Sequence, residues 1–271
     1  SQAFNDVEVA KTAGTLLNTG GSTTSLTVNN LTQTTGNFTA PATLTVDGSV
    51  LLSAGTFTAG TTINVAGDWT NNGATFTGGS STVTFNGSGA QTINGTSASQ
   101  IFYHLSISSS DTTTLGRNIG VSGNLSVSTG ILDLGAYTAN RSTSGGTLTV
   151  ANGATLKIGG GNTLPANYTT KTLGVSSTVE YSGTSQSVSG ETYGNLSTSG
   201  SGTKTLAGNT TVNGVLTVGL GTVLDASTRT LILAGSGTPL VVNGTFTPSS
   251  STVSYTSGSG ATVTAVDYNH L

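Results

Sequence analysis

Short segments in which apolar and polar residues alternate recur along the first third of the chain. Four of them follow one another at steps of 18, 19 and 20 residues: Leu26–Val28, Leu44–Val46, Ile63–Val65 and Val83–Phe85. Such alternation is typical of a β-strand with one buried face. A second apolar series, Phe38, Phe57 and Phe76, runs beside the first at a constant spacing of 19 residues. Two registers that recur together indicate one structural coil of about 19 residues.

This repeat distinguishes stacked coils from hairpins. Gly, Asn or Ser follow each apolar segment within a few residues, which indicates turns. Consecutive hairpins would also give short strands, but they would not keep the same apolar registers one coil apart. Stacked parallel strands do, because each coil places its apolar side chains about 4.8 Å from those of the previous coil. The sequence therefore predicts an all-β fold, a right-handed parallel β-solenoid (β-helix) of roughly 12–13 short coils.

The two registers also predict the core. We expect Phe38, Phe57 and Phe76 to be buried in an internal aromatic stack. An aliphatic ladder is expected beside it, formed by Leu26, Leu44, Ile63 and Val83. Thr45 and Asn64 lie between apolar positions and should face outward, where β-branched Thr suits the pleated surface.

A second, longer repeat is superimposed on the coil repeat. A four-residue segment that begins with Phe or Tyr and ends with Val or Leu, here called the aromatic box, occurs at residues 4–7, 102–105, 193–196 and 268–271. A Thr-Val-x-Phe/Tyr strand precedes three of the boxes, at residues 82–85, 178–181 and 252–255. We interpret the boxes as boundaries of super-repeats within a single elongated solenoid domain, residues 1–271.

Composition excludes several classes of protein. The chain has 271 residues, no Cys and a net charge of −3, with 6% charged residues against about 25% in an ordinary domain. A disulfide scaffold or a Cys-ligated metal site needs Cys, and a nucleic-acid binder needs a basic surface. The chain contains no apolar run of about 18 residues, the length that would predict a membrane span. Met is also absent, so we expect a processed form or a segment of a longer protein, at an extracellular or cell-surface location.

The acidic residues do not predict an active site. The ten Asp and Glu are scattered, mostly one per coil, whereas a polysaccharide-degrading solenoid needs two or three together. Asp47 and Asp68 lie about one coil apart, and Asp133 and Asp225 occupy equivalent slots, which indicates turn chemistry. Trp69 is interpreted as packing on the flank of the solenoid, with a sugar-stacking platform as the alternative.

The positions of the histidines and of one glycine-rich segment also predict no catalytic or metal site. His104 and His270 stand in a box position that also takes Asp6 and Asn195, so we interpret this position as turn-forming. The glycine-rich segment 159–162 lacks the Asp of calcium-binding solenoid repeats. We therefore predict no catalytic residues, no cofactor, no metal and no enzymatic activity.

The segment from Thr82 to Ile93, followed by residues 102–107, resembles the tandem repeats of large secreted bacterial surface proteins. Those repeats have the form TVTFNG…QTI…FYNLTI and imply β-solenoid adhesins or surface fibres. The resemblance is clearest over residues 43–135 and 178–271 and weakest over 136–178. It concerns a style of repeat and implies no catalytic residues.

These observations favour a non-enzymatic structural segment of an extracellular filament or surface adhesin, a stiff rod that assembles end to end. The expected partner is a further copy of the chain, head to tail, or continuing repeats of the same chain. The junction is expected near Val7, Val9, Val266 and Leu271. Ten Asn-x-Ser/Thr sequons would carry glycans in a host that has the machinery.

Two other functions remain as alternatives to a structural role. One is a ligand-binding solenoid that recognises ice or carbohydrate, because Thr pairs flank Phe57 and Phe76 and should face outward in register. Asn37 interrupts this array one coil earlier. The other is a polysaccharide-degrading enzyme or phage tailspike built on a parallel β-helix.

Overall fold

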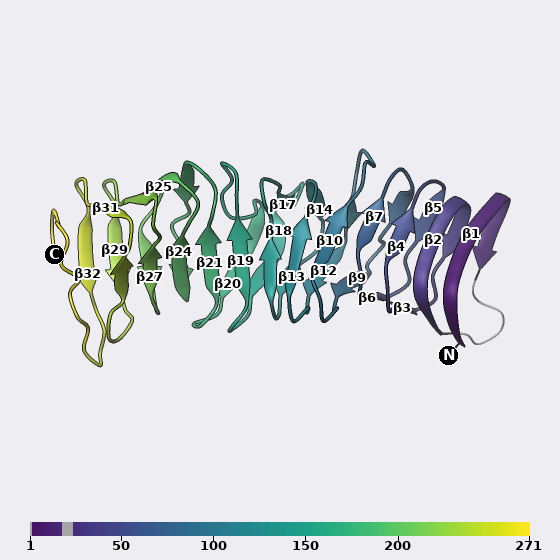
Figure 1. The fold of residues 1–271 in the computed structure, drawn as a ribbon, viewed down its shortest axis with the longest axis horizontal. Helices are drawn as coiled ribbons and strands as arrows, with labels where there is room; N and C mark the ends of the chain where they lie inside the picture. The colour runs from purple at the N-terminus through teal and green to yellow at the C-terminus, as the bar shows by residue number, and fades with distance from the viewer. Residues whose placement is uncertain (1, 18–23) are drawn as a thin grey trace. The chain divides into compact units, whose positions relative to one another are not determined.

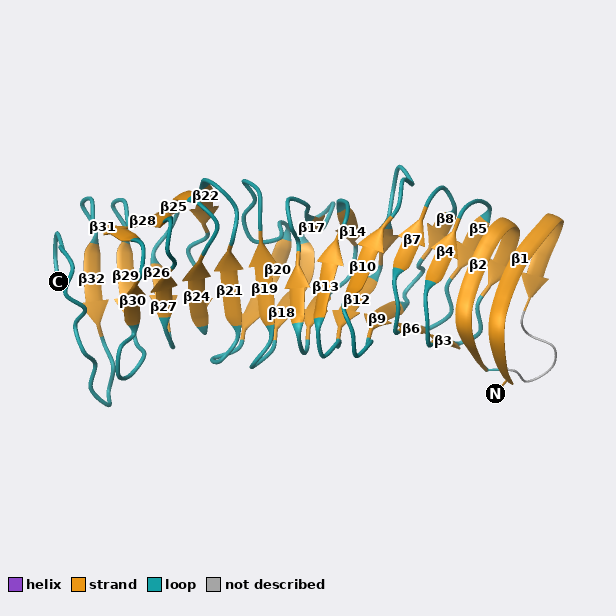
Figure 2. Cartoon of the chain, in the orientation of Figure 1, coloured by secondary structure: helices purple, strands orange, loops and turns teal. Residues whose placement is uncertain are grey.

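The computed structural model of the chain describes residues 2–17 and 24–271. Strands and turns make up these residues, and no helix occurs among them (Figure 2). Strands one coil apart pair in parallel, so that the chain forms a β-solenoid of about 12 turns. The all-β parallel solenoid predicted from the repeats is confirmed.

The chain divides into two compact units, of which the first contains residues 1–132, 138–148 and 167–171. Its strands follow one another along the unit in sequence order (Figure 1). They are β1 (Gln2–Leu17), β2 (Ser25–Thr39), β3 (Thr43–Val46), β4 (Val50–Leu52), β5 (Thr56–Thr58), β6 (Thr62–Val65), β7 (Trp69–Asn71), β8 (Thr75–Thr77), β9 (Thr82–Phe85), β10 (Gln91–Asn94), β11 (Ile101–Phe102), β12 (His104–Ile107), β13 (Thr112–Leu115), β14 (Ile119–Val121), β15 (Leu125–Val127) and β17 (Ala139–Asn140).

The second unit contains residues 133–137, 149–166 and 172–271. Its strands are β19 (Thr155–Ile158), β21 (Thr178–Tyr181), β22 (Gln186–Val188), β23 (Thr192–Tyr193), β24 (Asn195–Thr198), β25 (Gly202–Leu206), β26 (Thr210–Val212), β27 (Leu216–Val218), β28 (Thr222–Asp225), β29 (Thr230–Leu233), β30 (Leu240–Val242), β31 (Thr245–Thr247) and β32 (Thr252–Tyr255). Three strands, β16 (Ile131–Asp133), β18 (Gly145–Val150) and β20 (Tyr168–Leu173), have residues in both units.

An aliphatic ladder forms the core on one side of the first unit. Leu44 lies opposite Leu26 in one neighbouring coil and opposite Ile63 in the other, and Val83 follows Ile63. All four side chains are buried, and each contributes about 1.5–3 kcal/mol relative to exposure. Thr45 alternates with them and is half-buried on the outer face. The in-register stacking follows from the parallel pairing, which brings the same position of each coil together.

The aromatic series stacks in the same way, with one difference from the expectation. The ring centroids of Phe57 lie 5.4 Å from Phe38 and 5.6 Å from Phe76. Phe38 and Phe57 are buried. Phe76 is only half-buried, because it lines a groove formed by residues 73–76, 97–99 and 101. The expectation that all three rings are buried is wrong for Phe76.

Trp69 occupies neither of the places expected for it. It is fully buried inside the solenoid, with ring centroids 6.1 Å from Phe57, 5.0 Å from Phe76 and 5.5 Å from Phe102. Its indole N–H donates a hydrogen bond to the Gln100 side chain at 3.3 Å. Both the flank and the sugar-platform interpretations are therefore wrong, and Trp69 is a core residue.

Glycine sets the turn before the Phe strands. Gly36 and Gly55 are one coil apart and have φ angles of +78° and +83°, which favour Gly. A Cβ atom added to Gly55 would lie 1.7 Å from the Gly36 carbonyl oxygen. The turn therefore requires Gly in both successive coils.

Candidate functional site

The carboxylates are engaged in turns and in contacts between coils. Asp133 accepts a hydrogen bond from the Gly135 N–H, and Asp225 accepts one from the Ser227 N–H, each at 2.8 Å. These two equivalent bonds confirm the turn chemistry inferred from their slots. Asp68 accepts from the Thr92 N–H at 2.7 Å. In the described part of the chain, no three His, Asp or Glu residues come together in a group that could hold a metal ion.

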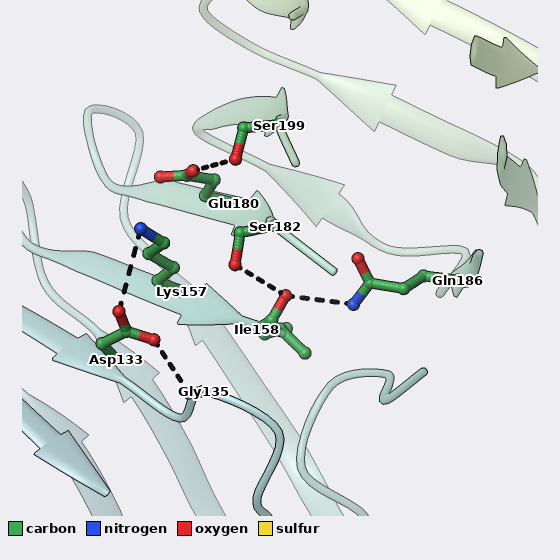
Figure 3. Close-up of polar contacts among 8 residues, drawn as sticks. All are labelled: Asp133, Gly135, Lys157, Ile158, Glu180, Ser182, Gln186 and Ser199. Carbon is green, nitrogen blue, oxygen red and sulfur yellow. Dashed lines mark hydrogen bonds and ion pairs between the residues drawn. The ribbon is translucent and has the colours of Figure 1, made fainter. Parts of the chain in front are cut away.

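One cluster of charged side chains lies on the outer face of the second unit (Figure 3). The Lys157 ammonium is 3.8 Å from the Asp133 carboxylate, and Glu180 lies opposite Lys157 in the strand pairing. Glu180 also accepts a hydrogen bond from the Ser199 hydroxyl. The Lys157 and Asp133 side chains are partly exposed, and ion pairs in contact with water contribute little. The cluster therefore links successive coils and does not resemble a catalytic acid–base pair.

The polar position of the aromatic box has one role in three boxes. Asp6, His104 and Asn195 each accept a hydrogen bond from a backbone N–H of the following coil, at 2.9–3.1 Å. Hydrogen bonds from Asn29 and Asn30 lower the pKa of Asp6. The position needs a hydrogen-bond acceptor, and this explains why Asp, His and Asn each occur there in different boxes. The turn-forming interpretation is therefore wrong, because Asp6, His104 and Asn195 lie in strands β1, β12 and β24 and bond to the next coil.

The same contact recurs outside the boxes, where sequence reasoning did not find it. Asn side chains of one coil accept from backbone N–H groups of the next coil at Asn30–Ser49, Asn37–Thr56, Asn72–Thr96, Asn118–Thr138, Asn152–Ser176 and Asn209–Thr230. In every pair the acceptor belongs to the earlier coil. The stack of coils is therefore polar, since side-chain acceptors point toward the following coil. The sequence signal is Asn recurring near the turns.

A second unforeseen feature is a buried lysine. The Lys204 ammonium is enclosed in the core and donates to the carbonyl oxygens of Gly183, Thr184 and Ser201 at 2.5–2.7 Å. Burial lowers the pKa of Lys204. Its in-register neighbour Gln186 satisfies inward-facing carbonyls in the same way. Lys204 therefore closes a backbone corner and belongs to the core.

Of the residues expected at a junction, Val9 is buried in its own coil, at 1% exposure, whereas Leu271 is 66% exposed. Val7 and Val266 are half-buried. The box leucines Leu105 and Leu196 are buried. The structure thus places an exposed leucine in the fourth box where two inner boxes bury theirs.

The hydroxyl pairs near the boxes repeat in the same manner. Tyr181 and Tyr193 are buried, with hydroxyl oxygens 3.3 Å apart, and burial raises the pKa of both. Tyr255 and Tyr268 form the equivalent pair at 2.7 Å, and both are half-buried. The last described coil therefore has the internal geometry of an inner coil without the cover that an inner coil has.

No protein-family model, curated protein or solved structure matches this chain. Nor does any helix in the described residues have the length and apolar character needed to cross a membrane.

Proposed function

We propose that the chain is a non-enzymatic structural segment of an extracellular filament or surface adhesin, in which solenoid coils stack end to end. The observation that carries this proposal is the exposed Leu271 in a box whose inner equivalents are buried. Covering an exposed apolar residue and the open edge of a strand is favourable. A solenoid coil is the cover that the inner boxes use.

The remaining surface supports a mechanical role. Outward positions carry mainly Thr, Ser and Asn, and the Asn and Asp side chains bond successive coils together. Within each unit, parallel backbone ladders and a shared core resist bending, because each coil contacts its neighbours. The same construction would let the segment display a binding surface at a distance from the cell.

Electron microscopy of the purified chain over a range of concentrations tests this function. We expect filaments whose length increases with concentration, since head-to-tail contacts do not close. Sedimentation of a single monomeric species at all concentrations would contradict the proposal.

The outer face of the first unit favours a second candidate, a surface that binds ice or a repetitive carbohydrate. One outward column is in register over six coils and consists of Thr27, Thr45, Asn64, Thr84, Ser106 and Ser126. The column on the Phe strands is shorter, because Asn37 lies opposite Thr56. Thermal hysteresis and glycan-array binding of the purified chain test this candidate.

A further inference from the structure

The groove beside Phe76 interrupts the aromatic column of the first unit. β8 pairs with β5, so that Phe76 lies opposite Phe57. Residues 95–100 of the following coil form no strand, and β11, which begins at residue 101, pairs with β14 of the coil beyond. The groove lies in this gap and has a volume of about 340 Å³. This volume is within the range of roughly 300–1,000 Å³ that is usual for small-molecule sites.

The open edge of β8 directs backbone groups into the groove. The Thr75 N–H donates to the Gly55 carbonyl at 2.8 Å, and the Thr77 carbonyl accepts from the Ala59 N–H at 2.9 Å. Both residues therefore bond to the preceding coil. Because successive residues of a strand direct their N–H and C=O groups to opposite sides, those of Phe76 point toward the following coil. The groove thus offers a donor and an acceptor beside an aromatic ring.

A buried side-chain network holds both walls of the groove in place. The Asn71 carboxamide accepts from the Ala74 N–H at 3.0 Å and donates to the Ala74 carbonyl at 3.1 Å, which fixes one wall. It also donates at 2.9 Å to the side-chain oxygen of Gln100, which lies between two residues of the other wall. Asn71 and Gln100 are both buried. The groove is therefore preformed, and a ligand would not have to order it on binding.

The ends of the groove are closed, which excludes an extended peptide as its occupant. At one end the Ser97 N–H donates to the Asn71 carbonyl at 3.0 Å. At the other end, a Cβ atom added to Gly78 would lie 3.4 Å from the Tyr103 nitrogen. A strand that adds to an open sheet edge has to run past both ends. The groove therefore fits a compact ligand.

The lining of the groove defines the chemistry of that ligand. Phe76 and Ile101 supply apolar surface, the hydroxyl groups come from Thr75, Ser97 and Ser99, and none of the lining residues is charged. A matching ligand is neutral, has one apolar face and carries hydroxyl groups at its edges. A pyranose ring has this chemistry, because its C–H groups suit the negative face of an aromatic ring and its hydroxyl groups can bond to the edge of β8.

We propose that this groove binds one pyranose unit of a neutral carbohydrate, stacked on Phe76 as the next member of the aromatic column. The rings of this column follow one another at 5.4 and 5.6 Å, and the groove occupies the next place. The site lies on the Phe strands and is separate from the outward column that contains Thr45. It requires no end-to-end assembly, and it would give a displayed solenoid a ligand of its own.

Saturation-transfer NMR and titration with four methyl glycosides test the site, those of glucose, galactose, mannose and N-acetylglucosamine. Phe76→Leu keeps an apolar side chain and removes the ring. Ala98→Trp fills the groove from its rim, where Ala98 is exposed. Ala136→Trp is the matched control, because Ala136 is also exposed and lies in a turn of the second unit. Circular dichroism verifies that every variant is folded.

We expect saturation transfer to at least one glycoside. Its affinity should fall by about fivefold in Phe76→Leu, since an aromatic contact contributes about that factor, and binding should be lost in Ala98→Trp. The control should bind like the wild type. No transfer to any of the four glycosides, or equal affinity in Ala98→Trp and wild type, would overturn the site. Binding that persists in Ala98→Trp and is lost in Thr45→Tyr would also overturn it, and would assign the sugar to the outward column.

Discussion

At the scale of the residue, Phe57 accounts for a large share of the stability of its coil. Its ring is buried between Phe38 and Phe76 and against Trp69. Phe57→Ala would leave a cavity that the surrounding strands cannot close, because their backbones are fixed by ladders on both sides. We expect a loss of about 3–5 kcal/mol in the free energy of unfolding, measured with urea.

Phe76→Ala provides the comparison. This ring is half-buried, so its removal should cost clearly less than that of Phe57. The outward Thr58→Ala should change stability little. Equal losses for the two Phe variants would contradict the burial that distinguishes them.

Lys204 predicts a pH dependence of stability. Its pKa in the folded chain is below the ordinary value of 10.5, so the unfolded chain binds more protons between these two values. Stability therefore rises as the pH increases through this window, and the contribution is absent below the folded pKa and complete above 10.5. Urea unfolding of the wild type and of Lys204→Gln at neutral and alkaline pH measures it. The stability of the wild type relative to this variant should increase with pH; a constant difference would exclude the effect.

At the scale of the element, the box position acts through a hydrogen bond between coils. His104→Ala removes the acceptor of the Asn124 N–H and should cost about 1–3 kcal/mol if that donor stays unpaired. His104→Asn should retain most of the stability, because Asn195 fills the equivalent position with the same bond. Thermal unfolding of both variants measures this, and equal destabilisation would show that the ring contributes through packing instead.

Which elements the sequence predicts depends on how uniform their residues are. The strands at 43–46, 62–65 and 82–85 are predictable because the same positions stay apolar in every coil. The column that contains Trp69 was not recognised, because its register partner is the much smaller Val50. Lys204 was missed for a related reason: its charge indicates a surface, and only the carbonyls of the neighbouring coil explain its burial.

At the scale of the whole molecule, the expected junction residues differ in what they can test. Val9 faces the core of its own first coil, so Val9→Asp should unfold that coil. A loss of assembly in this variant would say nothing specific about the junction. Leu271 is exposed, so its substitution should leave the fold intact and affect only assembly.

Leu271→Asp is therefore the decisive variant for assembly. In an end-to-end contact the new carboxylate would lose its water, and this desolvation opposes the contact. We expect short soluble species in place of filaments, with circular dichroism and the urea midpoint unchanged. Val175→Asp is the matched control, because Val175 is 67% exposed and Leu271 66%, and Val175 lies in a loop between β20 and β21. This control should still form filaments. If both variants assemble like the wild type, the exposed leucine is not part of a junction; if both fail, added negative charge alone prevents assembly.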